Sequence, residues 1–139
     1  MAFFPDDFPI PGIGEFNRPF FTSGKIVVQE CQACGTVQHP PEEVCNNCLK
    51  REFNYRETNG KGEIYSYIVV HNPPSPALAG VVPYAVVLVT PEEYPHVRIL
   101  GNVVNRKPNE IKIGQKVQAV FEEIDDEEEK ILMPQWEVV

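Results

Sequence analysis

All four cysteines of this 139-residue chain lie in one short stretch, as the pairs Cys31/Cys34 and Cys45/Cys48. Two residues between thiolates let one tight turn present both sulfurs to a single ion, so the two Cys-x-x-Cys pairs match the ligand spacing of a zinc ribbon. Gly35 can adopt the positive φ of the first knuckle. Asn46 and Asn47 are the next best residues for that geometry in the second knuckle.

The alternatives to zinc are two disulfides or an iron ion in a rubredoxin-like site. Aspartates and prolines interrupt the first dozen residues, so we expect no secretory signal and a cytoplasmic protein. In a reducing compartment such cysteine pairs bind metal far more often than they form disulfides. Four thiolates fill a tetrahedral shell and leave no position for water or substrate, so we predict a structural zinc ion rather than a catalytic one.

The charge of the chain bears on its partners. The formal net charge is −8, from 12 Lys and Arg against 20 Asp and Glu. A nucleic-acid-binding protein needs a basic face that displaces counterions from phosphate, so the charge disfavours such a partner. Because zinc ribbons and OB-folds both bind nucleic acids elsewhere, this function stays as the alternative. No apolar stretch is long enough to span a membrane, and we expect no membrane partner.

The first 59 residues divide into two predicted parts. Residues 1–22 are rich in proline and phenylalanine without any periodicity, which predicts an irregular N-terminal arm. Residues 23–59 form the predicted zinc ribbon, with an opening strand at 24–30 and a Pro40-Pro41 turn between two short strands. The polar residues 49–58 indicate a connector. His39 is a spare metal ligand that a four-cysteine site does not need.

Residues 60–139 show a mainly β pattern. In the first predicted strand, Ile64, Ser66, Ile68 and Val70 share one face. A proline-rich loop follows at 72–83, a segment with at most one helical turn at 105–114, and an acidic hairpin loop at 125–129. The five strands and the lack of a crossover helix predict a five-stranded OB-fold barrel, with a sandwich fragment or an SH3-like barrel as alternatives. The strands are predicted at 63–71, 84–90, 97–104, 115–123 and 131–138.

Together these motifs resemble the family of rubredoxin-like zinc ribbon plus OB-fold proteins known as domain of unknown function thirty-five. The resemblance covers nearly the whole chain, and its specificity lies in the order and spacing of its parts. Two departures are an arm with Pro19 where members often have a helix, and His39 where an aromatic residue is common. The matching segments are 24–34, 60–71, Pro83-Tyr84, 101–104, 113–117 and 121–123.

The resemblance implies a non-catalytic accessory subunit of a thiolase-like enzyme. Similar proteins occur with archaeal acetoacetyl-CoA thiolases, with steroid side-chain aldolases and with benzoylsuccinyl-CoA thiolase of anaerobic toluene degradation. The implied partner is a thiolase-like subunit in a hetero-oligomer built on a partner dimer. The implied ligand is CoA or acyl-CoA, bound together with that partner.

The residues agree that this chain is not the catalyst. A thiolase needs an activated cysteine nucleophile, and all four cysteines are assigned to the metal, so we expect no catalytic residue here. Leu78, Val81 and Val82, in the loop at 72–83, are expected to dock on the partner near its acyl-CoA entrance. The alternative is that this loop folds back over its own barrel.

Overall fold

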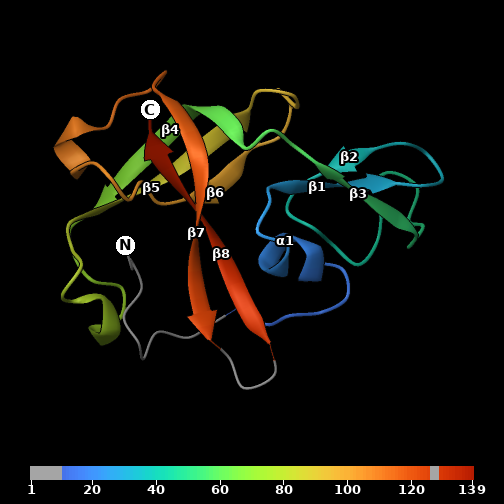
Figure 1. The fold of residues 1–139 in the computed structure, drawn as a ribbon, viewed down its shortest axis with the longest axis horizontal. Helices are drawn as coiled ribbons and strands as arrows, with labels where there is room; N and C mark the ends of the chain where they lie inside the picture. The colour runs from blue at the N-terminus through green and yellow to red at the C-terminus, as the bar shows by residue number, and fades with distance from the viewer. Residues whose placement is uncertain (1–10, 126–128) are drawn as a thin grey trace.

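Two antiparallel β-sheets form the structure, a computed structural model that describes residues 11–125 and 129–139 (Figure 1). The smaller sheet has the order β2-β1-β3 and the larger one the order β6-β5-β4-β7-β8. This confirms the prediction of a mainly β protein. The smaller sheet comprises β1 (Val27–Cys31), β2 (Val37–Gln38) and β3 (Phe53–Glu57), and the larger one β4 (Lys61–Val70), β5 (Tyr84–Pro91), β6 (Ile99–Gly101), β7 (Lys116–Asp125) and β8 (Lys130–Val138).

The smaller sheet differs from the prediction in its third strand. β3 lies in the segment expected to be a connector, and it pairs along its whole length with β1, from Val27↔Glu57 to Cys31↔Phe53. That expectation was wrong because Phe53 and Tyr55 alternate with polar residues, as in a half-buried strand. Of the two short strands predicted on either side of the Pro40-Pro41 turn, the structure has β2 before it, and no strand lies between the turn and the second cysteine pair.

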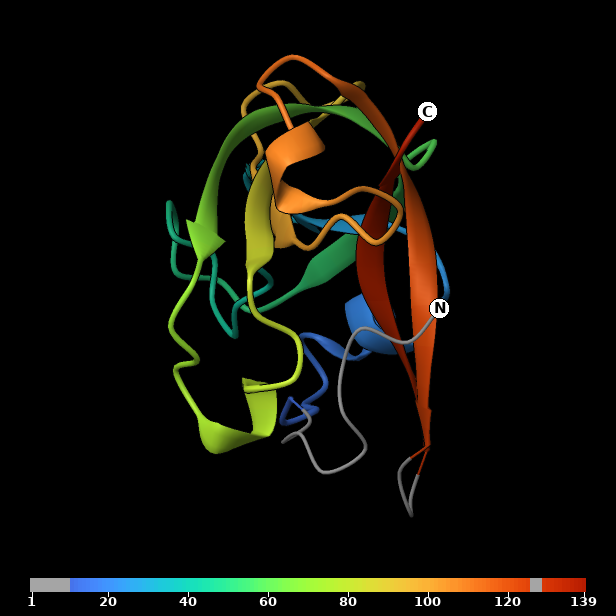
Figure 2. The ribbon, with the colours of Figure 1, turned by 90° about the vertical axis from the view of Figure 1, so that its left-hand side faces the viewer.

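The larger sheet closes into a barrel, as the OB-fold prediction requires. Val103 forms a parallel bridge with Trp136 of β8, just beyond the end of β6. The Trp136 amide donates to the Asn102 carbonyl at 2.9 Å, and the Val104 amide donates to the Trp136 carbonyl at 2.9 Å. Figure 2 shows β4 curving around one side of this barrel and the β7–β8 hairpin running along the other.

A β-bulge in β4 changes which of its residues face the core. The register against β5 shifts between Ile64 and Ser66. Ile64 is therefore fully buried, whereas Ile68 is 62% exposed on the outer face with Ser66 and Val70. The expectation that all four residues share one face was wrong, because a bulge inserts one extra residue and reverses the alternation after it.

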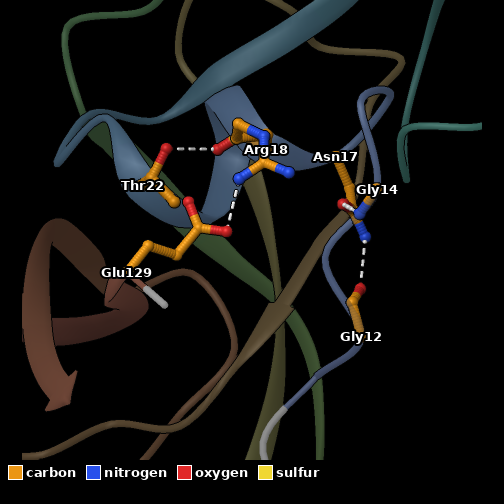
Figure 3. Close-up of polar contacts among 6 residues, drawn as sticks. All are labelled: Gly12, Gly14, Asn17, Arg18, Thr22 and Glu129. Atoms are coloured by element: carbon orange, nitrogen blue, oxygen red, sulfur yellow. Dashed lines mark hydrogen bonds and ion pairs between the residues drawn. The ribbon is translucent and has the colours of Figure 1, made fainter. Parts of the chain in front are cut away.

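The N-terminal segment ends in a short helix, α1 (Arg18–Thr22). Residues 11–17 have no helix or strand, as predicted, but the arm's last residues are helical because Pro19 lies in the first turn, where its missing N–H is not needed. Figure 3 shows how the helix is held: Asn17 bonds to Gly12 and Gly14, and Arg18 pairs with Glu129 at the β7–β8 hairpin. The arm's residues 1–10 lie outside the described residues.

The loops that connect the barrel strands match the predicted loops in part. Residues 105–114 contain a single 3₁₀ turn, η2 (Pro108–Glu110), as predicted. The loop after β4 contains another 3₁₀ turn, η1 (Pro76–Leu78), which the Ser75 hydroxyl caps by accepting from the Ala77 amide at 3.2 Å. Residues 126–128 of the predicted acidic hairpin loop lie outside the described residues, but Asp125 pairs with Lys130 at its base.

One hydrophobic core joins the two sheets. Phe20 of α1, Ile26 and Val28 at the ribbon, and Ile64 and Trp136 of the barrel belong to the same buried cluster. Within residues 11–125 and 129–139, no helix has the length and apolar character needed to cross a membrane.

Candidate zinc centre

The four cysteine sulfurs come together beside the three-stranded sheet. All four lie within 4.8 Å of one another, with Cys31 Sγ 3.5 Å from Cys48 Sγ and Cys34 Sγ 3.6 Å from Cys45 Sγ. Zinc–sulfur bonds of about 2.3 Å in a tetrahedron place the sulfurs about 3.8 Å apart. A disulfide requires about 2.05 Å, and all four cysteines are free. The four thiols therefore fit one tetrahedral ion and do not form disulfides.

The two knuckles use equivalent positions to make their turns. Gly35, directly after Cys34, has φ +76°, and its amide donates to the Cys31 carbonyl at 2.9 Å. Leu49, directly after Cys48, has φ +66°, and its amide donates to the Cys45 carbonyl at 3.0 Å. The prediction for Gly35 is confirmed. A leucine in the left-handed region is unusual because its Cβ crowds the carbonyl.

The prediction that Asn46 or Asn47 would take the positive φ was wrong, because the turn comes after the second cysteine of the pair and not between the two. Asn47 instead supports the sulfurs. Its amide donates to Cys45 Sγ at 3.4 Å, and its side-chain nitrogen lies 3.6 Å from Cys34 Sγ. Such bonds stabilise thiolates and orient metal ligands.

The cluster is electrostatically suited to a cation. Hydrogen bonds from the Thr36 side chain and backbone lower the pKa of the Cys34 thiol to about 5. At Cys48 a backbone bond from Lys50 lowers the pKa, but burial and the neighbouring sulfurs outweigh it and raise the pKa to about 12. A negative charge on one sulfur thus disfavours a negative charge on its neighbours, whereas a divalent cation among them would stabilise all four thiolates. Such an ion would be fully ligated by protein, so it would hold the two knuckles together rather than activate water.

Two buried glutamines, which the sequence reasoning missed, hold the second knuckle in place. Gln38 Oε1 accepts from the Asn46 amide at 2.9 Å, and Gln38 Nε2 donates to Gln29 Oε1 at 2.7 Å and to the Val44 carbonyl at 3.1 Å. Gln29 in turn accepts from the Glu42 amide at 3.0 Å and donates to its carbonyl at 2.8 Å. Gln29 is 0% exposed and Gln38 5%. The available signal was a glutamine on the buried face of an apolar strand.

His39 is not part of the metal cluster. Its ring packs on Phe20, with ring centroids 5.0 Å apart, and the metal-binding group found in the described residues contains the four cysteines alone. Burial lowers the pKa of His39 to about 4, so the ring is neutral near pH 7. It therefore fills the space of an aromatic side chain beside α1.

The residues predicted to contact a partner lie in the loop between β4 and β5. Leu78 is 6% exposed and so packs within its own chain, whereas Val81 and Val82 are half-buried. Docking through this loop stays a prediction.

Two further histidines, His71 directly after β4 and His96 in the turn before β6, are both exposed. Neither belongs to a metal-ligand group within the described part of the chain.

The fold and the site define a class of protein: a four-cysteine zinc ribbon joined to an OB-fold barrel. Two family models match the corresponding segments, the ChsH2 rubredoxin-like zinc ribbon domain at residues 22–54 and the ChsH2 C-terminal OB-fold domain at residues 55–122. The chain belongs to this family, which is also known as DUF35.

Relatives of two kinds share the matched region. A "DUF35 domain-containing scaffold protein" of Methanocaldococcus jannaschii is 38% identical over 73% of this chain and 71% of its own length. A "probable enoyl-CoA hydratase alpha subunit" of Thermomonospora curvata is 38% identical over 86% of this chain. The chain spans only 37% of that hydratase subunit's length.

Solved structures show the same fold. A chain of the "Ltp2-ChsH2(DUF35) aldolase" matches with a TM-score of 0.75 and 35% identity, over 93% of this chain and 98% of that one. A DUF35 protein of unknown function from Sulfolobus solfataricus matches with a TM-score of 0.52 and 20% identity, over 84% of this chain and 78% of that one, which shows the fold alone.

Proposed function

We propose that this protein is a non-catalytic, zinc-binding accessory subunit of a thiolase-like enzyme that acts on acyl-CoA. The observation that carries the proposal is the match over 93% of the chain to a chain of an aldolase described as Ltp2-ChsH2(DUF35). The names of two further relatives, hydratase alpha subunits for an enoyl-CoA and for 3-oxo-4,17-pregnadiene-20-carboxyl-CoA, also connect this domain pair with CoA thioesters.

The site supports a role in assembly rather than in chemistry. All four cysteines gather in one metal-ligand cluster, so no thiol in the chain is left to act as the nucleophile of a thiolase. The subunit would instead order the partner's active-site loops or complete one wall of its CoA channel, which positions the substrate. In this proposal the complex is a cytoplasmic hetero-oligomer built on a partner dimer, and its acyl-CoA substrate comes from the breakdown of aromatic or steroid compounds, as in benzoylsuccinyl-CoA thiolysis.

The docking surface in this proposal is the loop from Asn72 to Pro83. Val81 and Val82 are half-buried within this chain and can bury further against a partner. For the CoA phosphates, the exposed side chains of Lys25, Lys50 and Arg51 are basic candidates near the ribbon. Lys25 already pairs with Glu57, 2.5 Å from Nζ to Oε1, which leaves Lys50 and Arg51 as the stronger ones.

The test compares the thiolase-like subunit of the native host with and without this chain. We expect the partner alone to show a lower rate of carbon–carbon bond cleavage or a higher KM for its acyl-CoA, and this chain to restore both. Val81→Asp and Val82→Asp should weaken the complex, whereas Ile113→Asp, at an exposed apolar residue in another part of the barrel, should not. Full activity and normal CoA affinity of the partner alone would refute the proposal.

The alternative function, binding of single-stranded nucleic acid, is tested separately. The net charge of −8 speaks against it. Filter binding at low salt should detect no affinity for single-stranded DNA or RNA, since few phosphate contacts can form. A micromolar affinity that falls steeply with added salt would favour the alternative.

A further inference from the structure

A hollow of about 590 Å³ opens at the end of the barrel where η2 lies beside the last residues of β4 (Figure 1). Its floor is apolar. Tyr67 and Val69 come from the inner face of β4, where the residues of β5 that pair with them are buried. Ile111, which is 3% exposed, and Pro108 complete the floor. The volume is in the range of small-molecule sites, and the mouth of a β-barrel is a common place for one.

Four polar side chains line the same hollow: the Tyr67 hydroxyl, the His71 ring, the Lys107 ammonium and the Asn109 amide. None of the four makes a hydrogen bond or ion pair within the part of the chain that the structure describes. His71, Lys107 and Asn109 are exposed, and the Tyr67 hydroxyl is open to solvent, so a ligand can reach them. All four groups can donate a hydrogen bond. The hollow therefore offers several free donors to a ligand that accepts.

The charge of the hollow is positive. None of its described lining residues is an aspartate or glutamate, although the whole chain has a formal net charge of −8. The neighbouring carboxylate of Glu110 caps η2 by accepting from the Lys107 backbone amide at 2.8 Å, and it makes no ion pair with the Lys107 ammonium. A cation beside an apolar floor, with no acidic side chain in the lining, favours an anionic ligand.

We propose that this hollow binds a small organic carboxylate with an aromatic or aliphatic body. The body packs on Tyr67, Val69 and Ile111, and the carboxylate accepts charge-assisted hydrogen bonds from Lys107 Nζ and the Asn109 amide at the rim. The one lysine of the lining matches the single charge of a carboxylate, whereas a polyanion such as a nucleic acid requires several cations. The inference concerns this chain alone and does not depend on the proposed function.

The test uses the full-length, zinc-loaded chain and the probe 2-naphthoate, with 2-naphthamide as an uncharged probe of the same shape. We expect 2-naphthoate to bind saturably and to shift the Val69 and Ile111 backbone signals and the Asn109 side-chain signals in a ¹H–¹⁵N spectrum. It should bind about fivefold more tightly than the amide, a preference that added salt reduces because the charge lies at an exposed rim. A lack of saturable binding, equal affinity for the two probes, or saturation that leaves these signals unmoved would overturn the proposal.

Two variants test which cation is recognised. Lys107→Met removes the ammonium and keeps a side chain of similar shape, so it should abolish the preference for 2-naphthoate over the amide. The matched control is Lys112→Met, which removes the same charge from an exposed residue of the same connection outside the lining and should keep the preference. Both lysines are exposed, so both variants should fold. An equal preference in the two variants, whether kept or lost, would contradict the site.

Discussion

At the residue scale, the least expected feature is Leu49, which has φ +66° with a 73% exposed side chain. The left-handed conformation costs a leucine about 1–2 kcal/mol, and glycine avoids this while losing about 0.5–1 kcal/mol of chain entropy. Leu49→Gly should therefore stabilise the zinc-loaded protein by about 0.5 kcal/mol, measured by thermal unfolding. The matched control is Lys50→Gly, which should destabilise because Lys50 is not among the residues of positive φ. A lower melting temperature for Leu49→Gly would contradict the strain argument.

His39 carries a pH-dependent contribution to stability. Its pKa is about 4 in the folded protein and about 6.5 in the unfolded chain, because burial disfavours the charged ring. The unfolded state therefore binds more protons between these values, so the free energy of unfolding falls as the pH drops from 6.5 to 4, by roughly 2–3 kcal/mol in total.

The variant His39→Phe keeps a ring against Phe20 and should remove this part of the pH dependence. Urea unfolding of both proteins across pH 4 to 7 checks it. Loss of zinc at low pH affects both proteins alike, so the difference between them isolates His39. Parallel curves would show that the histidine does not titrate in this way.

The residues that could be predicted from sequence were those whose chemistry is local. The cysteine spacing and Gly35 identify the metal site because each knuckle is a single tight turn. Leu49 could not be identified, since the knuckle turn, closed by the bond from its amide to the Cys45 carbonyl, holds it in a conformation against its own preference. Gln29 and Gln38 could not be identified either, because their partners become neighbours only once β1 and β2 pair.

At the scale of elements, the glutamine pair connects β1 and β2 to the loop that carries Cys45. Removing hydrogen bonds that hold metal ligands in place typically changes metal affinity by about 10- to 100-fold. Gln38→Met should therefore lower the zinc affinity about tenfold, measured by competition with a chromophoric chelator. Gln32→Met is the matched control, because Gln32 is exposed beside Cys31 and its side chain bonds to Phe53 and Asn54, away from that loop. Equal affinities for the two variants would show that the knuckle does not depend on the pair.

The elements that were missed share a physical cause. β3 is short and polar on one face, so its strand character shows only in the alternation of Phe53 and Tyr55, and its stability comes from pairing with β1. The bulge at Ile64/Ser66 also depends on tertiary pairing, because either register keeps an apolar residue at alternate positions. The strands β4, β5, β7 and β8 were predictable because each is long and bounded by turn residues, whereas β6 is only 3 residues long.

At the scale of the whole molecule, the sequence suggested a boundary between residues 59 and 60, and that division stays a prediction. The two sheets nevertheless share one buried cluster, in which Ile26 and Val28 at the ribbon pack with barrel residues such as Ile64. Barrel closure through Val103 and Trp136 could not be inferred from strand counting, because it depends on strand tilt and stagger. The shared core implies that the metal stabilises more than the ribbon.

This coupling gives the last prediction. Cys45→Ser should release zinc and unfold the ribbon, because a structural zinc site couples binding to folding. Since β1 contributes to the common core, the melting temperature of the barrel should also fall. The fluorescence of Trp136, the only tryptophan and one that is fully buried in β8, reports this transition.

In the wild type, zinc release and the Trp136 transition should coincide on heating. The variant should also fail to assemble with the thiolase-like partner. A zinc-free variant that keeps the wild-type Trp136 transition and still assembles would show that the barrel and its loop suffice, and that the ribbon is an independent unit.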